Sequence, residues 1–523
     1  MPKRHKELHS NLRLLAKTSA IVLIGLFISK ILGYAYRVII ARSLGPETYG
    51  LYSLAIMILG WFAAIPAMGL AEGLMRFIPF YRGKGEQRKI QFLVRFALAV
   101  SIVSSIIAGI IMFFLADFVS VTIFHNAGLI IFLKVFSILV PVSILNGILL
   151  SIIRAYEKIS VYSFIYNILQ NVVKVGMLVL LVYIGITNLS VVLSHLAGLL
   201  IMLIVAYLVV KYKISELLVK FSLSNTEKSR IRSALFSYSW PIVFISVLGS
   251  IFYWIDSISI GYFQNATAVG FYNAAVPIAA LLALAPELFL QLFFPLITKE
   301  YSRKNFRLIK DLSQQVGKWI FILNLPVFLL VMLFPGAFLN ILFGAQYLAA
   351  QNALRFLAAG AFISSMFVIS SNLLSMLGKS KLLLFNISIS AVLNFLLNMY
   401  LVPKYGIDGA SIATMICSIL LAAMFLFEAN YHTAIIPLKR KMFNVLFSAA
   451  IPTIAFLFIR PYIQINLFSV ILVGIIFLAV YACLILLTKS LDRNDLLIWE
   501  SVKKKASSIK HLIYAGEIKE DID

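Results

Sequence analysis

The stretch from Tyr81 to Phe118, YRGKGEQRKIQFLVRFALAVSIVSSIIAGIIMFFLADF, joins a basic loop to a long apolar run. The basic side chains gather between Arg82 and Lys89, whereas residues 90–115 carry a single charge. A helix of about 20 apolar residues crosses the hydrocarbon core of a bilayer. Lys and Arg stay on the cytoplasmic side during insertion. The stretch therefore predicts a membrane helix that starts in the cytoplasm.

The same pattern recurs along the whole chain. About fourteen apolar segments are long enough to span, at 14–41, 50–74, 90–115, 128–153, 161–184, 188–210, 235–262, 269–297, 318–343, 350–377, 382–402, 407–428, 443–460 and 467–488. If every segment crosses, most of the 45 Lys and Arg residues fall on one side. We therefore expect a multi-pass protein of the cell (plasma or inner) membrane with both termini in the cytoplasm.

The composition excludes a soluble protein. The chain has 523 residues, of which 62% are hydrophobic and 13% charged, whereas soluble domains are roughly 45 to 50% apolar. A net charge of +24 would suggest nucleic-acid binding in a soluble protein, but membrane topology accounts for it here. We expect no nucleic-acid partner.

The chain repeats itself after about 220 residues. Gly50-Leu51-Tyr52 recurs as Gly270-Phe271-Tyr272, Ala155-Tyr156-Glu157-Lys158 matches Leu377-Gly378-Lys379-Ser380, and Gly185-Ile186 matches Gly406-Ile407. Six segments separate each pair, so the halves have the same orientation. The expected fold is an all-α polytopic membrane protein with two parallel six-helix repeats around a central cleft and two extra C-terminal helices. The expected parts are an N-lobe (1–215), a C-lobe (216–430), the last two spans (431–490) and a cytoplasmic tail (491–523).

Two stretches carry a family resemblance. KILGYAYRVIIARSLGPETYGLYSLA at 30–55 and GLAEGLMRFIPFYRGKGE at 69–86 resemble the N-terminal signature of the Wzx-type polysaccharide exporters. These flippases belong to the multidrug/oligosaccharidyl-lipid/polysaccharide (MOP) exporter superfamily. The resemblance extends through 378–414 and implies a fourteen-helix fold of two lobes, alternating access, and a polyprenyl-diphosphate-linked oligosaccharide as cargo.

Motifs of catalysis are missing from the sequence. It holds no GxxxxGK[ST] phosphate loop, no HExxH and no CxxC, which are the usual marks of nucleotide, zinc and redox sites. We therefore expect a transporter rather than an enzyme, with no catalytic residue, metal or cofactor. Besides the cargo, its expected partners are membrane lipids, with glycosyltransferases or a polymerase as candidates for assembly.

Charged residues within the apolar segments are the candidate site. Each costs roughly 2.5 to 3.5 kcal/mol at the bilayer centre, so such residues face a bundle interior, pair, or mark a substrate path. The cations are Lys30, Arg37 and Lys174, and the acids are Asp256 and Glu287. The surplus of cations suits a diphosphate, whereas ion pairing, such as Arg37 with Asp256, is the structural alternative. The two acids are candidates for coupling to a proton or Na⁺ gradient, or are merely counter-ions.

Amides at matching places in the two repeats form a second set: Asn167, Gln170 and Asn171 in the first half, and Asn386, Asn394 and Asn398 in the second. Hydrogen bonding between helices is one role for them. Contact with sugar hydroxyls is the other, and we include Asn171 and Asn394 among the candidate glycan-binding residues.

The sequence thus favours a flippase that moves a lipid-linked oligosaccharide from the cytoplasmic to the outer leaflet. The alternative is a multidrug or metabolite cation antiporter of the same superfamily, for which an acidic cavity is expected. A non-transporting membrane scaffold leaves the intramembrane charges unexplained.

Overall fold

The structure, a computed structural model, describes residues 2–214, 223–459, 467–488 and 490–491. Those residues form helices joined by short turns, and they contain no strand. The protein is an all-α polytopic membrane protein, as the sequence predicts. The expected cytoplasmic tail, from 492 onward, lies outside the described residues.

The first half of the chain contains seven α-helices and two short π-helical turns. They are α1 (Pro2–Ala64), α2 (Leu70–Gly83), α3 (Gln87–Phe118), η1 (Val119–Ile123), α4 (Gly128–Ala155), α5 (Ile159–Ser163), η2 (Phe164–Leu169), α6 (Gln170–Tyr183) and α7 (Asn188–Lys213).

The second half follows with α8 (Asn225–Phe263), α9 (Ala266–Ala279), η4 (Ala280–Ala283), α10 (Leu284–Ser302), α11 (Phe306–Leu333), α12 (Pro335–Leu342), η5 (Ala345–Ala350), α13 (Gln351–Met376) and α14 (Ser380–Thr433). Two further helices, α15 (Met442–Ile459) and α16 (Leu467–Leu487), close the described chain.

Eleven helical stretches of the described chain are long and apolar enough to cross a membrane. Two of them are too long for one crossing, and each breaks at a glycine: α1 at Gly45 (φ 83°) and α14 at Gly406 (φ 55°). Glycine tolerates this left-handed conformation because it has no Cβ. With these two breaks and the 39-residue helix α8, the elements match the fourteen spans expected from the sequence.

The turns between helices repeat in the two halves. The amide of Glu86 donates to the carbonyl of Tyr81, and Asn305 donates to Glu300 in the same way. Lys158 likewise donates to Ile153, and Lys379 to Leu374. Equivalent turns therefore end equivalent helices, as a duplicated fold requires.

One expected match was wrong by a single residue. Glu157 and Gly378 are the residues with positive φ in their turns, and the next helices begin at Ile159 and Ser380. Lys158 is therefore the partner of Lys379 rather than of Ser380. The spacing of 221 residues then agrees with Gly185 and Gly406, which both have positive φ.

The described chain forms two compact units. Unit 1 comprises Met1–Pro277, Leu342–Ala353 and Ala391–Thr414, and unit 2 comprises Ile278–Ile341, Leu354–Ser390 and Met415–Asp523. The lobe boundaries expected at 215 and 430 stay a prediction.

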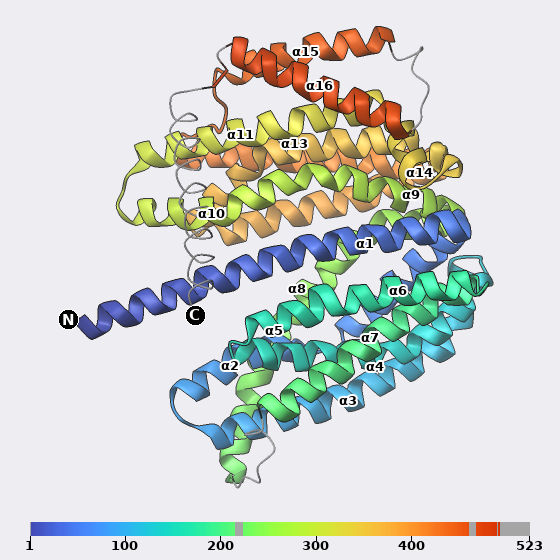
Figure 1. Cartoon of the computed structure of the whole chain (residues 1–523). Helices are drawn as coiled ribbons and strands as arrows, with labels where there is room; N and C mark the ends of the chain where they lie inside the picture. Colours follow the sequence, from blue (N-terminus) through green and yellow to red (C-terminus); the bar gives the residue numbers. More distant parts are fainter. Residues whose placement is uncertain (1, 215–222, 460–466, 489, 492–523) are drawn as a thin grey trace, which may run out of the picture. The chain divides into compact units, whose positions relative to one another are not determined.

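Within unit 1, the helices pack side by side as a bundle. Helix α4 contacts α3, α7 and α1, and α6 contacts α7 and α1 (Figure 1). Helix α8 also packs on α1, and it begins at a capping box in which Ser224 and Glu227 each accept the other's backbone N–H. Unit 1 holds the candidate site residues other than Glu287.

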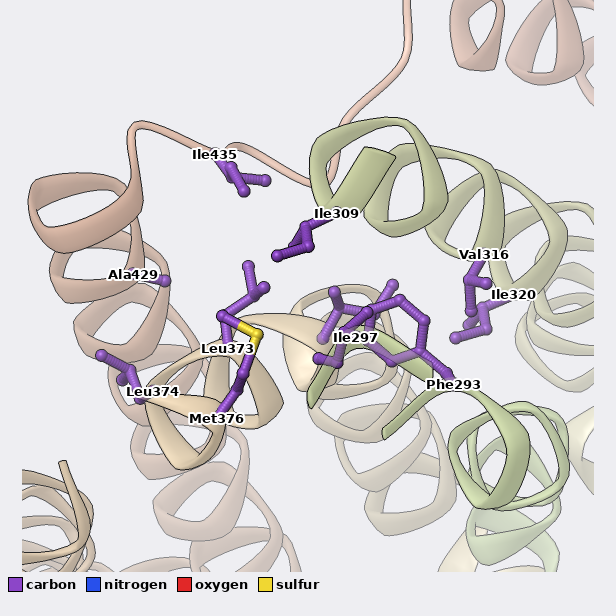
Figure 2. Packing of buried hydrophobic residues seen from close by; sticks show 11 residues of the cluster. Phe293, Ile297, Ile309, Val316, Ile320, Leu373, Leu374, Met376, Ala429 and Ile435 are labelled. Carbon is purple, nitrogen blue, oxygen red and sulfur yellow. The ribbon is translucent and has the colours of Figure 1, made fainter. Parts of the chain in front are cut away.

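Within unit 2, an apolar cluster joins α10, α11, α13 and the end of α14. Figure 2 shows Phe293, Ile297 and Ile309 facing Leu373 at its centre. Helices α15 and α16 lie outside the repeat and pack against α11, where Tyr481 donates a hydrogen bond to the Ile322 carbonyl at 3.0 Å.

Candidate functional site

A cationic cluster lies between α1 and α6 in unit 1. The Lys174 ammonium of α6 sits 4.6 Å from the centre of the Tyr36 ring on α1. This is a cation–π arrangement, in which the ring face attracts the positive charge. Arg37 is adjacent to Tyr36 in the chain, is partly buried, and interacts electrostatically with Lys174. The structure thus brings two of the three predicted cations together.

Tyrosine side chains interact electrostatically with the Arg37 guanidinium. Tyr34, Tyr49 and Tyr52 of α1 and Tyr253 of α8 are its electrostatic neighbours, and Tyr49 is also a side-chain hydrogen-bond partner. A phenol neutralises no charge, because it stays protonated at neutral pH. Arg37 therefore keeps its positive charge available in a polar setting.

Behind this cluster, buried hydrogen bonds join α1 to α7. The Tyr36 hydroxyl lies 2.9 Å from Ser194 Oγ and donates to the Val191 carbonyl at 3.0 Å. The Tyr52 hydroxyl lies 3.2 Å from His195 Nδ1. His195 is buried and hydrogen-bonded, so these contacts fix the position of the tyrosines.

A carboxylate cluster forms a separate centre in unit 1, around Asp256 of α8. Asp256 Oδ2 accepts hydrogen bonds from Tyr272 of α9 and Thr414 of α14, both at 2.5 Å. Its Oδ1 accepts from the Asn398 amide of α14 at 2.8 Å. The acid thus joins segments of three helices, and each oxygen has a donor.

The two clusters occupy equivalent places in the repeat. Tyr36 and Tyr52 precede Asp256 and Tyr272 by 220 residues, as Gly50 precedes Gly270. Ser194 lies beside Tyr36 as Thr414 lies beside Asp256. The tyrosine and the small hydroxyl are kept in both copies. The first copy carries a cation, and the second an anion.

The expected ion pair between Arg37 and Asp256 is not formed. Ion pairs found within the described ranges join other residues, as in the 2.9 Å contact between Lys134 and Asp117. Asp256 instead uses neutral donors, because Tyr272 and Thr414 lie closer to it. The ion-pairing alternative for Arg37 is therefore wrong in this conformation.

Lys30 and Glu287 are the two remaining charged candidates. Lys30 is exposed on α1, two turns before Arg37. Glu287 is exposed in the first turn of α10 and belongs to unit 2.

The predicted amides make hydrogen bonds between helices. Asn171 donates to Ser29 Oγ of α1 at 3.1 Å and to the Asn167 carbonyl of η2 at 3.0 Å. Asn394 donates to Thr414 Oγ1 at 3.2 Å, across the break of α14. These contacts are compatible with a role for the amides in positioning the two charged clusters.

Several site residues were not singled out from the sequence. Thr414 is one, although it follows Ser194 by one repeat length and this spacing was a usable signal. Glu428 is another, since it accepts a hydrogen bond from Asn386 at 2.6 Å in unit 2. No group of three or more His, Cys, Asp or Glu side chains that suits a metal occurs in the searched part of the chain.

Two models of known protein families match this chain. The model of the family described as polysaccharide biosynthesis protein matches residues 14–300, and the MatE model matches residues 241–400. A putative O-antigen transporter of Shigella flexneri is 25% identical over 73% of this chain and 89% of its own length. The probable low-salt glycan biosynthesis flippase Agl15 of Haloferax volcanii is 28% identical over 52% of this chain and 55% of its own length.

Among solved structures, the lipid II flippase MurJ in an inward closed conformation superimposes with a TM-score of 0.69. It covers 91% of this chain and all of its own, at 17% identity, which shows a shared fold. The first family model alone spans more than half of the chain. The chain therefore belongs to the polysaccharide biosynthesis protein family, within the MOP exporter superfamily of membrane transporters.

Proposed function

We propose that this protein flips a polyprenyl-diphosphate-linked oligosaccharide from the cytoplasmic to the outer leaflet of the cell membrane. The observation that carries the proposal is the pair of cations, Arg37 and Lys174, held among tyrosines within apolar helices. The named relatives, an O-antigen transporter and a glycan biosynthesis flippase, support the same class of cargo. The proposed orientation has both termini in the cytoplasm.

The chemistry of the cationic cluster suits a diphosphate linked to a sugar. Two cations in a low-dielectric setting attract an anion far more strongly than they do in bulk water. The planar guanidinium of Arg37 can hold two phosphate oxygens at once, and Lys174 supplies a point charge. Tyrosine hydroxyls near Arg37, and the Asn171 amide of the same unit, offer donors and acceptors to sugar hydroxyls. In an alternating-access cycle these groups would hold the headgroup while the lipid tail stays in the bilayer.

The test is a flipping assay with purified protein in liposomes and a labelled polyprenyl-diphosphate oligosaccharide. Arg37→Ala and Lys174→Ala should each lower the initial rate roughly tenfold to a hundredfold, because each loses a charge-assisted contact. Arg37→Lys should keep part of the rate, since a point charge remains without the bidentate fork. Lys134→Ala is the matched control, because Lys134 is a lysine of unit 1 that pairs with exposed Asp117.

Folding must be followed in the same preparations. If Arg37→Ala and Lys174→Ala unfold at the temperature of the wild type and flip at its rate, the substrate-contact proposal is wrong. If both variants lower the unfolding temperature and lose activity, Arg37→Lys distinguishes a role in substrate binding from a role in stability. A purely structural arginine predicts that the lysine variant recovers stability and the full rate together.

The Asp256 cluster favours a second candidate function, export of cations. The MatE model covers this part of the chain, and a carboxylate can attract a cationic drug or metabolite. Cation efflux should then depend on Asp256 and be indifferent to Arg37. Export of a cationic dye that Arg37→Ala leaves unchanged, with no flipping of the lipid-linked oligosaccharide, would replace the flippase proposal.

A further inference from the structure

Unit 2 contains a basic pocket at the two ends of α14. This helix reverses at Gly406, and the 2.6 Å hydrogen bond from Asn386 to Glu428 shows that its first and last turns lie together. A cavity of about 520 Å³ opens there. Its lining includes Lys379, Ser380, Lys381, Leu382, Phe385 and His432. The pocket thus combines three nitrogen bases with an apolar floor, and among the described residues no carboxylate lines it.

The equivalent turn of the first half is built differently. There the Lys158 ammonium donates to the Lys213 carbonyl at 2.5 Å, and the acidic Glu157 precedes it. In the second half Gly378 stands in the place of Glu157, and Lys379 lines the open pocket. The copy whose cations face a cavity thus has no acid at this position. This difference between two copies of one turn points to a ligand that is negatively charged.

Nearby aromatic residues place the pocket at the level of the lipid headgroups. Phe427 and Tyr431, one turn apart near the end of α14, are 72% and 79% exposed. Exposed aromatic side chains of this kind are typical of the interface between membrane and water. The nearest carboxylate along that turn is Glu428, which is already bonded to Asn386. The charge of the pocket therefore remains positive at headgroup depth.

An apolar track leads from the pocket along the membrane-spanning helix. Leu382, Phe385 and Ile389 are spaced three and four residues apart, so they share one face of α14. Phe385 is 60% exposed and Ile389 38%. A ligand with a phosphate at one end and a hydrocarbon chain at the other matches a basic pocket that continues into such a track.

We propose that this pocket binds the phosphate of an anionic phospholipid, with an acyl chain along Phe385 and Ile389. The Lys379 and Lys381 ammonium groups and the His432 imidazole contact the phosphate. The N-terminal end of the α14 helix dipole adds partial positive charge. This site is separate from the cationic cluster of unit 1, and it does not depend on the proposed cargo.

The experiment uses the full chain, purified in detergent and titrated with phosphatidylglycerol or with phosphatidylcholine of the same acyl chains, with bound lipid counted by native mass spectrometry. The wild type should prefer phosphatidylglycerol. Lys379→Gln and Lys381→Gln should each weaken that binding about fivefold, and together about thirtyfold, since a lysine near an anionic lipid contributes on this scale. Lys304→Gln is the matched control, because Lys304 is an exposed lysine in another turn and does not line the pocket.

Two further measurements separate a lipid from a free phosphate. Millimolar inorganic phosphate should leave phosphatidylglycerol binding unchanged, because it lacks the apolar contacts. Phe385→Ala with Ile389→Ala should weaken lipid binding while the protein unfolds at the wild-type temperature. The proposal is overturned if the double lysine variant keeps the preference for phosphatidylglycerol. It is equally overturned if inorganic phosphate displaces the lipid and the apolar double variant binds it normally, since the ligand is then a free phosphate.

Discussion

At the scale of single residues, one difference between the repeats accompanies the opposite charges of their two clusters. Tyr36 and Asp256 stand at equivalent positions, and each is bonded to a hydroxyl on a neighbouring helix, Ser194 in one copy and Thr414 in the other. The Lys174 ammonium lies over the Tyr36 ring, whereas Asp256 accepts hydrogen bonds from neutral donors. Equivalent positions of the two repeats thus hold a cation site in one copy and an acid site in the other.

The acid site is where we expect transport to be coupled to an ion gradient. A carboxylate inside the membrane is a common binding place for a proton or Na⁺. The Thr414 hydroxyl adds an oxygen next to Asp256, and the Asn394 amide oxygen shares the Asn398 donor with it. Asp256→Asn keeps the shape of the side chain but removes its charge. We expect flipping by this variant to lose its dependence on the gradient, as measured in liposomes with an imposed proton or Na⁺ gradient.

The control for that experiment is Glu287→Gln, because Glu287 is exposed in the other unit. It should respond to the gradient as the wild type does. Should both variants keep the full response, neither acid couples transport to the gradient, and Asp256 serves only to join its three helices.

At the scale of elements, a close crossing of two helices in unit 1 explains the repeated glycines. A Cβ atom at Gly50 would lie 1.7 Å from the Ala266 carbonyl oxygen, and one at Gly270 would lie 2.0 Å from the Pro46 carbonyl oxygen. The backbones of α1 and α9 therefore meet directly, as small residues permit in membrane helices. Tyr52 and Tyr272 each follow their glycine by two residues, so this crossing also positions both charged clusters.

Substitution of these glycines should therefore harm the whole site. Gly50→Ala and Gly270→Ala must push the helices apart, at a cost of about 1 to 3 kcal/mol, and should lower the unfolding temperature as well as the flipping rate. Gly33→Ala is the control on the same helix, because a Cβ atom there meets no other atom within 4 Å. Wild-type stability of Gly50→Ala would show that α1 and α9 do not cross this closely in the membrane.

Sequence patterns predicted the elements better than the contacts. Apolar length gave the spans, and the recurrence of Gly-x-Tyr gave the repeat, because both are properties of the chain itself. The partner of Asp256 was not predictable in this way. Charge alone favours Arg37 as the partner of Asp256. The structure instead pairs Asp256 with Tyr272 and Thr414, and helix packing determines which side chains reach it. The exposure of Glu287 likewise depends on which way α10 faces.

At the scale of the whole molecule, the distribution of positive charge decides the orientation. Arg230, near the start of α8, and Arg440, in the turn before α15, are exposed and expected to face the cytoplasm. Gln264 and Thr187 are exposed in turns expected to face outward. For the introduction of a labelled cysteine, Thr187 is a better position than Gly185, because φ is 89° at Gly185 and a side chain there is strained.

Labelling of single cysteines in intact cells tests this orientation. The two native cysteines are first replaced by Cys417→Ser and Cys483→Ser, since Cys483 is exposed and would react. A reagent that cannot cross the membrane should then label Gln264→Cys and Thr187→Cys from outside. Arg230→Cys and Arg440→Cys should react only after the cells are opened, because the positive loops stay inside. These four positions sample both repeats and the last two helices, so they test the orientation along most of the chain. External labelling at Arg230 would contradict this orientation, because the basic segment before the second repeat would then lie outside the cell.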